Sequence, residues 1–320
     1  MTTWLVGNPA AGDGDRGVEF WLERLRSAGL DVDETIDPGG LDGASIEGDD
    51  RVLAAGGDGT VQAAAGACAR AGAVLAVLPS GTANDFSCSL GLTGDPDEAC
   101  RAVVDDIRAV IDLGRIEASS GRRTFINVAH MGLGAEASRA VDDRDKKWLG
   151  GFSYAGRLIE RWREHRGTRG RLRCDDRVFV GRWLEIAVAN GAFYGGGNRV
   201  PEAEVDDGAL EVYAVRADHP LRLVWTFAAV KLLGPERFRS PKLVHQRCRR
   251  VSLTTKRPMA TTADGEDLGE TPIEIELEAG ALTVVRGPGP GAFGSSGQAS
   301  DKPSSQADNS QPKTSNEDTP

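Results

Sequence analysis

A glycine-rich run with one aspartate is the sharpest chemical feature of the sequence, and its residues are Gly56, Gly57, Asp58, Gly59 and Thr60. The run follows an apolar stretch and opens an alanine-rich, helix-forming segment. Glycines there let backbone N–H groups approach an anion, and a helix N-terminus adds partial positive charge. A phosphate would repel Asp58 unless a divalent cation joined the two, so we predict Asp58 as a Mg²⁺ ligand. The alternative is a structural turn in which Asp58 caps the helix.

A second polar loop spans residues 79–86, in the order Pro-Ser-Gly-Thr-Ala-Asn-Asp-Phe, directly after the next apolar run. The Thr82 hydroxyl and the amides of Gly81 and Thr82 can hold a nucleotide phosphate, and Asn84 offers both a donor and an acceptor. The alternative is that Asn84 or Asp85 only caps the next helix. Because such sheets bind ligands where neighbouring parallel strands end, we expect both loops to form one site.

Two groups of carboxylates lie in the second half of the chain. Asp264 and Glu266 flank a glycine that lets the chain turn, so one can act as general base on a hydroxyl while the other faces metal or nucleotide. A surface turn is the alternative there. Glu204 and Asp207, with a backbone carbonyl such as that of Ala209, can hold a hard cation. An acidic hairpin loop is the alternative for this second group.

Residues 12–17 fit the pattern G-x-G-x-x-G of dinucleotide-binding turns. That fingerprint requires its first glycine at the immediate end of the first strand. Here the residues from Gly7 to Ala11 intervene, and Asp13 and Asp15 would face the pyrophosphate. These departures disfavour an NAD-dependent oxidoreductase.

The elements that position these loops follow from the hydrophobic pattern. Apolar runs alternate with helix-forming segments over the first third of the chain, which indicates parallel βαβ units and a doubly wound α/β lobe. From about Arg122 onward, period-2 stretches indicate a strand-rich β-sandwich lobe. The expected strands of the second lobe lie at 124–131, 178–190, 209–215, 250–255, 273–277 and 282–285, with helices near 135–166 and 221–233.

The predicted domains are a nucleotide-binding α/β domain over residues 1–121 and a β-sandwich domain over 122–287. The remaining residues 288–320 are rich in Gly, Pro, Ser, Gln, Asn and Asp. Such a composition buries too little apolar surface to order a segment. We therefore predict a disordered tail over 288–320.

Composition excludes several classes of protein. The chain has 320 residues, 40% of them apolar and 27% charged, with a net charge of −10, which is typical of a soluble globular protein and argues against a general nucleic-acid binder. It has no apolar run long enough to span a membrane and no secretory signal pattern. Five cysteines without a CxxC pattern and four scattered histidines disfavour a disulfide framework and a zinc finger. We therefore expect a cytoplasmic protein.

Basic residues concentrate in two islands, 144–182 and 235–257. The first contains a basic, aromatic segment from Lys146 to Arg163, a composition that suits peripheral contact with an anionic membrane surface. Core packing of its aromatic residues and solvated arginine-rich faces are the alternatives.

Four motifs in this order resemble the diacylglycerol kinase catalytic family, which includes soluble bacterial lipid kinases and, more distantly, sphingosine and ceramide kinases. They are Asn8-Pro9 with Gly12, the run 56–60, the run 79–86 and Asp264-Gly265-Glu266. The resemblance spans nearly residues 4–287, and the two middle motifs together are highly specific. It implies an α/β lobe like that of NAD kinases, a β-sandwich lobe that holds the lipid, and ATP with Mg²⁺ between them.

The resemblance also implies roles for single residues. Asp264 would take the proton from the lipid hydroxyl, Asp58 would work with catalytic Mg²⁺, and Glu266 would contact the nucleotide. Glu204, Asp207 and the Ala209 carbonyl would align with a structural cation site, although the family usually has Asp or a neutral amide at the first position and often Leu at the third. The other predicted nucleotide contacts are Asn8, Gly56, Gly57, Gly59, Thr60, Gly81, Thr82 and Asn84.

The function that the resemblance implies is transfer of the ATP γ-phosphate to the hydroxyl of a diacylglycerol-like or dialkylglycerol lipid, by a peripherally membrane-associated enzyme of phospholipid biosynthesis. An NAD kinase shares the run 56–60, but the run 79–86 favours the lipid branch. A non-catalytic lipid or nucleotide sensor is the second alternative, although Asp58 and Asp264 are both present. The particular lipid and the oligomeric state stay open, with a homodimer through the second lobe suggested by analogy.

Overall fold

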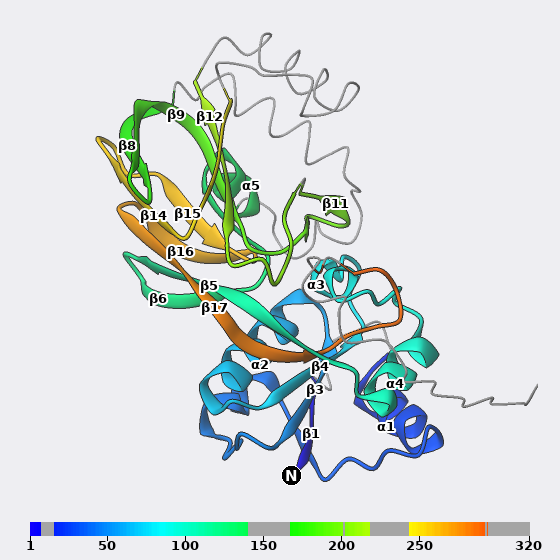
Figure 1. Ribbon diagram of the computed structural model, residues 1–320. Helices are drawn as coiled ribbons and strands as arrows, with labels where there is room; N and C mark the ends of the chain where they lie inside the picture. The colour runs from blue at the N-terminus through cyan, green and yellow to red at the C-terminus, as the bar shows by residue number, and fades with distance from the viewer. Residues whose placement is uncertain (8–15, 140–166, 201, 218–242, 292, 294–320) are drawn as a thin grey trace, which may run out of the picture.

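The computed structural model describes residues 1–7, 16–139, 167–200, 202–217, 243–291 and 293. Within them, two lobes share one continuous sheet of 15 strands (Figure 1). A separate small hairpin pairs β10 (Phe193–Tyr194) with β11 (Asn198–Arg199).

The first lobe is built on four parallel strands in the order β2-β1-β3-β4. Strands β3 and β4 are buried almost throughout because helices and loops cover both of their faces. This arrangement confirms the predicted α/β lobe. Its elements are β1 (Thr3–Gly7), α1 (Val18–Ser27), β2 (Glu34–Ile36), the 3₁₀ helix η1 (Pro38–Gly43), β3 (Arg51–Gly56), α2 (Asp58–Ala71), β4 (Val74–Pro79), α3 (Asp85–Ser89) and α4 (Pro96–Asp105).

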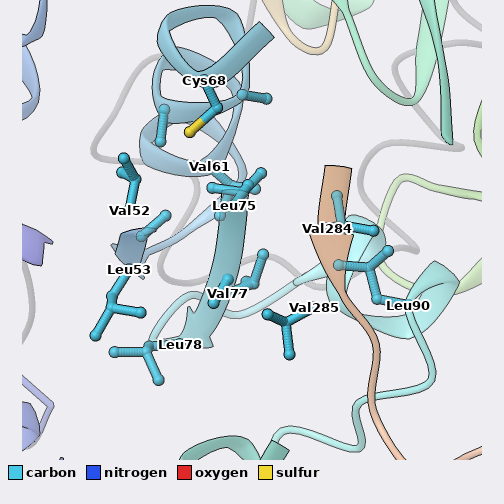
Figure 2. Close-up of a cluster of buried hydrophobic side chains, with 14 of the residues drawn as sticks. Val52, Leu53, Val61, Cys68, Leu75, Val77, Leu78, Leu90, Val284 and Val285 are labelled. Carbon is cyan, nitrogen blue, oxygen red and sulfur yellow. The ribbon is translucent and has the colours of Figure 1, made fainter. Parts of the chain in front are cut away.

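The core of the first lobe packs α2 against the central strands (Figure 2). Ala64 and Ala65 of α2 are fully buried, and their small size lets the helix lie close to Leu53 and Leu75 on the sheet. Tight packing of this kind leaves little freedom for the helix to shift. The N-terminus of α2 is therefore fixed at the carboxyl ends of β3 and β4.

The second lobe is mostly antiparallel and has its own apolar core, which confirms the predicted β-sandwich. Helix α5 (Leu133–Arg139) overlaps the start of the helix expected near 135–166. The rest of that helix, the basic aromatic segment and the helix expected at 221–233 lie outside the described residues. The strands are β5 (Arg108–Ala118), β6 (Gly121–Phe125), β7 (Val128–Gly132), β8 (Thr168–Cys174), β9 (Arg177–Ala189), β12 (Leu210–Arg216), β13 (Leu243–Cys248), β14 (Arg250–Thr255), β15 (Ala260–Ala263), β16 (Glu266–Glu270) and β17 (Ile273–Val285).

Strand β17 runs through both lobes. Its first half pairs with β14, its last residues pair in parallel with β4, and β5 pairs with it along both halves. The prediction of a separate strand over 282–285 within the second domain is wrong, because Leu282, Val284 and Val285 are buried in the core of the first lobe. A register shift between Glu278 and Leu282 interrupts the local pattern without ending the strand.

The chain also packs beyond the predicted start of the tail. The amides of Gly287 and Gly289 donate to the carbonyls of Leu90 and Gly91, at 2.8 and 3.0 Å. Phe293 is 7% exposed and lies in the core of the first lobe. The predicted disorder is therefore wrong for residues 288–291 and 293, because backbone hydrogen bonds and one aromatic side chain anchor them. Residues 294–320 lie outside the described structure.

Among the helices in the described ranges, none combines the length and the apolar character needed to cross a membrane.

Candidate active site

The two glycine-rich loops lie against each other at the carboxyl ends of β3 and β4. The amide of Ser80 donates to the carbonyl of Gly56 at 3.0 Å. A side chain on Gly81 would come within 2.7 Å of the Gly57 Cα, and one on Gly56 within 2.5 Å of the Thr60 side chain. Contacts this close exclude a side chain at positions 56 and 81. The structure therefore brings together the two loops that the sequence predicts to share one site.

Helix α2 begins at Asp58, and its N-cap is Gly57, which has no side chain to bond the N–H groups of the first turn. The N–H groups of that turn can therefore bind an anion. The Asp58 carboxylate interacts with the amides of Phe86 and Asp85, at the start of α3, and with its own amide. The alternative in which Asp58 only caps its own helix is thus wrong, because Gly57 occupies the capping position.

Asn84 folds the second loop on itself. Its side-chain nitrogen donates to the Gly81 carbonyl at 2.7 Å, and its side-chain oxygen accepts from the Gly81 amide at 3.0 Å. The Gly81 amide is engaged in this way, whereas Thr82 is exposed, so its hydroxyl can donate to an anion. Binding of a nucleotide by Asn84, Gly59 or Thr82 stays a prediction.

Asp264 and Gly265 form the two-residue turn between β15 and β16, with φ values of 46° and 86°. Two positive φ values are typical of a type I′ hairpin turn, for which Asp-Gly is a favoured pair. This turn directs Asp264 at the backbone between β6 and β7. Its Oδ2 accepts the Ile126 amide at 2.7 Å, and its Oδ1 accepts the amides of Asn127 and Val128, each at 3.0 Å.

Carboxylates from both lobes lie close enough to perturb one another. Burial raises the pKa of Asp264 to about 6, the three amide donors oppose this rise, and the charge of Asp58 adds to it. The pKa of Asp58 is raised by burial and then by the charge of Asp85. A divalent cation bound by carboxylate oxygens would relieve this repulsion. The donor set at Asp58 therefore fits the predicted Mg²⁺.

Asp85 also belongs to this centre, although the sequence suggests for it only a role as a helix cap. It is 5% exposed, and its carboxylate accepts the amides of Gly196 at 3.1 Å and Gly197 at 2.7 Å in the β10–β11 turn. It thereby ties the first lobe to the second beside Asp58. The three consecutive glycines at 195–197 are a sequence signal that could have pointed to an anion-binding turn.

Asp85→Ala is expected to lower the free energy of unfolding by about 1–3 kcal/mol, because it removes a charged acceptor that holds the backbone N–H groups of Gly196 and Gly197. Urea unfolding followed by circular dichroism measures the change. Asp42→Asn is the matched control, since Asp42 is 94% exposed beside Arg70 and such surface pairs contribute little. A change for Asp85→Ala no larger than that of the control would contradict the inter-lobe tie.

A second polar group lies in the β-sandwich lobe near this centre. His130 Nδ1 is 2.9 Å from Glu185 Oε1, and Glu185 Oε2 accepts the Gly134 amide at 2.7 Å. The Tyr194 ring is 6.1 Å from that of His130. Burial raises the pKa of Tyr194, and the charges of Glu185 and Asp85 add to the rise. No local sequence pattern indicates this group, because only the fold brings its members together.

The predicted second cation set does not fit a metal ion in this structure. Asp207 Oδ2 lies 2.7 Å from the Arg247 guanidinium, and Asp207 Oδ1 accepts the Ala209 amide at 3.0 Å. Burial raises the pKa of Asp207 to about 6, Arg247 opposes this rise, and the nearby Glu204 adds to it. An arginine side chain thus supplies positive charge where a metal ion was expected.

Two predicted nucleotide contacts remain. Glu266 is exposed at the start of β16, directly after the turn that carries Asp264. Asn8 lies outside the described residues.

Comparison with known proteins agrees with this architecture of two lobes. Residues 2–116 match the diacylglycerol kinase catalytic domain, and residues 127–286 match the YegS C-terminal NAD kinase beta sandwich-like domain. A putative diacylglycerol kinase from Bacillus anthracis has the same fold, with a TM-score of 0.69 and 23% identity over 90% of this chain and 98% of its own.

Two bacterial relatives, each described as a probable lipid kinase YegS-like, are similar in sequence. The protein from Pseudomonas aeruginosa is 33% identical over 236 residues, which cover 73% of this chain and 75% of the relative. The protein from Chromohalobacter salexigens is 34% identical over 232 residues, covering 69% and 73%. The chain therefore belongs to the YegS-like family, which joins a diacylglycerol kinase catalytic domain to a β-sandwich domain.

Proposed function

We propose that this protein transfers the γ-phosphate of ATP to the hydroxyl of a diacylglycerol-like or dialkylglycerol lipid. The observation that carries the proposal is that Asp264 and Asp58, from opposite lobes, lie close enough for the charge of Asp58 to raise the pKa of Asp264, beside a helix N-terminus whose cap residue, Gly57, has no side chain. Phosphoryl transfer requires chiefly positioning and neutralisation of charge, and such a centre can provide both. The relatives described as probable lipid kinases support a lipid acceptor.

Different residues bind the phosphates, hold the metal ion and accept the proton. Amides of the α2 N-terminus and of Thr82 bind the phosphates, and Asp58 holds Mg²⁺, which when bound neutralises phosphate charge. Asp264 Oδ2 accepts the Ile126 amide, whereas Oδ1 accepts two amides, so Oδ2 is the atom that takes the proton of the lipid hydroxyl. The three amides hold this carboxylate in a fixed direction.

The pH dependence follows from the pKa of Asp264. A general base must be ionised, and the pKa of this carboxyl is about 6, so we expect kcat/KM to fall as the pH drops below about 6. Initial rates in a set of buffers of constant ionic strength measure the profile. A flat profile between pH 5 and pH 7, roughly spanning that pKa, would contradict Asp264 as the base.

The acceptor is tested with purified protein, labelled ATP and Mg²⁺ against diacylglycerol, dialkylglycerol, a sphingoid base and a polyprenol in mixed micelles. The proposal expects one of the two glycerolipids to be labelled best. An NAD arm tests the alternative activity, since the β-sandwich domain is described as NAD kinase-like. Labelling of NAD alone would overturn the lipid acceptor, and ATP binding without any transfer would favour a sensor.

A membrane-resident acceptor requires contact with the bilayer surface, and we expect that contact to be peripheral. Basic residues concentrate at 144–182 and 235–257, parts of which lie outside the described residues. Attraction between such segments and anionic lipid weakens as salt rises. Co-sedimentation with phosphatidylglycerol vesicles should therefore fall with added salt, and binding that is indifferent to both salt and anionic lipid would contradict this expectation.

A further inference from the structure

The loop before β12 is rich in acidic residues. Glu202, Glu204, Asp206 and Asp207 lie within eight positions of Ala209, and Glu211 follows on β12. The Glu211 side chain is only 2% exposed and that of Asp207 only 9%. Buried carboxylates at this density require a compensating cation.

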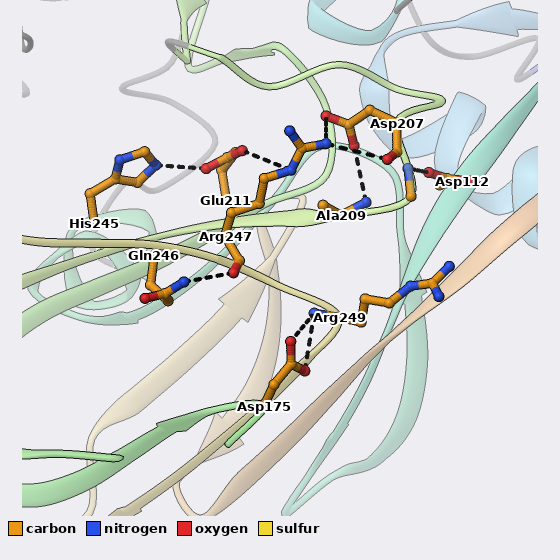
Figure 3. A network of polar contacts seen from close by, with 10 residues as sticks. Asp112, Asp175, Asp207, Ala209, Glu211, His245, Gln246, Arg247 and Arg249 are labelled. Atoms are coloured by element: carbon orange, nitrogen blue, oxygen red, sulfur yellow. Dashed lines mark hydrogen bonds and ion pairs between the residues drawn. The ribbon is translucent and has the colours of Figure 1, made fainter. Parts of the chain in front are cut away.

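Arg247 contacts this loop at several points (Figure 3). Its Nη2 lies 2.7 Å from Asp207 Oδ2 and 3.3 Å from the Asp207 carbonyl oxygen. Its Nε lies 3.7 Å from Glu211 Oε1. One guanidinium therefore contacts a carboxylate and a backbone carbonyl together, which are the same kinds of oxygen donor that a hard cation would use.

Sheet register fixes this position of Arg247. Strands β12 and β13 are antiparallel, and Glu211 stands directly opposite Arg247. Opposite residues on paired strands share one face of the sheet. The pairing therefore fixes the backbone position from which the Arg247 side chain reaches the loop. His245 completes the arrangement, with Nε2 2.6 Å from Glu211 Oε2 and its ring stacked on that of Tyr213.

The loop that Arg247 holds is joined to the strand leading into the active centre. Asp112 on β5 accepts the Gly208 amide at 2.7 Å, and its own amide donates to the Val205 carbonyl at 2.7 Å. Asn190 bonds the carbonyls of both Asp112 and Ile126. The loop is therefore anchored on one side by Asp112 and on the other by Arg247.

We propose that Arg247 is the resident cation of the 202–209 loop, and that this protein binds no divalent metal ion at Glu204, Asp207 and Ala209. A guanidinium carries its charge at every physiological pH and needs no metal supply. The Mg²⁺ that the proposed function requires would then bind at the Asp58 centre rather than at Glu204, Asp207 and Ala209. The inference rests on charge and geometry at the loop and is independent of the acceptor and of transfer activity.

The test counts Mn²⁺ bound to the nucleotide-free full chain by electron paramagnetic resonance, with Asp58→Asn present throughout to silence the active centre. We expect that adding Asp207→Asn to this background removes no bound Mn²⁺. Adding Arg247→Met instead should create one Mn²⁺ site per chain, because the carboxylates lose their cation, and Asp207→Asn should then abolish it. Arg247→Lys keeps the charge and should create no site.

Two results would overturn the proposal. Bound Mn²⁺ that Asp207→Asn removes from the Asp58→Asn chain, with Arg247 intact, would mean that a metal displaces the guanidinium. Absence of a new site in a folded Arg247→Met chain would mean that these oxygens do not form a cation site. Circular dichroism checks folding, and if Arg247→Met does not fold, the first comparison still decides the proposal because it leaves Arg247 in place.

Discussion

Asp264→Asn is expected to lower kcat by about 10²- to 10⁴-fold, the range that a positioned general base contributes. The asparagine amide has no basic oxygen that can take the proton of a hydroxyl. It also cannot accept all three N–H groups of residues 126–128, because its nitrogen is a donor. Turnover of ATP into phosphorylated lipid measures the loss.

The control must separate lost chemistry from a disturbed hairpin. Asp267→Asn removes a carboxylate from the same hairpin, where Asp267 is exposed and pairs with Arg139. We expect this variant to keep the wild-type rate. Thermal unfolding of both variants shows whether the hairpin is retained. Transfer by a folded Asp264→Asn protein within tenfold of the wild-type rate would contradict the role of Asp264.

Asp58→Asn is expected to reduce transfer on the order of 10²- to 10³-fold, the loss typical of removing one electrostatic contact to the transition state. We do not expect this substitution to destabilise the folded protein. Because burial and the charge of Asp85 raise the pKa of Asp58 in the folded state, its ionised carboxylate destabilises the protein above that pKa. Removal of the charge should leave the melting temperature at neutral pH equal or higher.

The sign of this effect can be checked against pH. As the pH falls toward about 4, Asp58 becomes protonated in the folded wild type, so the stability advantage of the variant should shrink. Asp97→Asn is the matched control, since Asp97 also lies in the first turn of a helix but is exposed beside Arg24. It should keep full activity. A strongly destabilised Asp58→Asn protein would contradict the electrostatic account of this centre.

Much of the architecture could be predicted from local patterns. The two glycine-rich loops were predicted to meet because each follows a buried apolar run, and parallel strands place their carboxyl ends at one edge. The close approach of Gly57 and Gly81 agrees with that reasoning. The strand at Arg250–Thr255 has the predicted bounds, because alternation of burial along it is regular.

Other features depend on contacts that no local pattern contains. The segment around Gly280 resembles a turn. Strand β17 nevertheless continues past it into the first lobe, because β17 pairs with β5 on both sides of this segment. The Asp207–Arg247 ion pair joins residues 40 positions apart, at carboxylates that the sequence predicts as metal ligands. Asp85 resembles a helix cap, and only the β10–β11 turn reveals its second role.

Transfer of labelled γ-phosphate from ATP to a total lipid extract, in Mg²⁺ and at low and high salt, tests the central claim most directly. We expect one labelled lipid with the wild-type protein, none with Asp264→Asn, and unchanged labelling with Asp267→Asn. Absence of a labelled lipid with wild-type protein that still binds ATP, or equal labelling by Asp264→Asn, would contradict it.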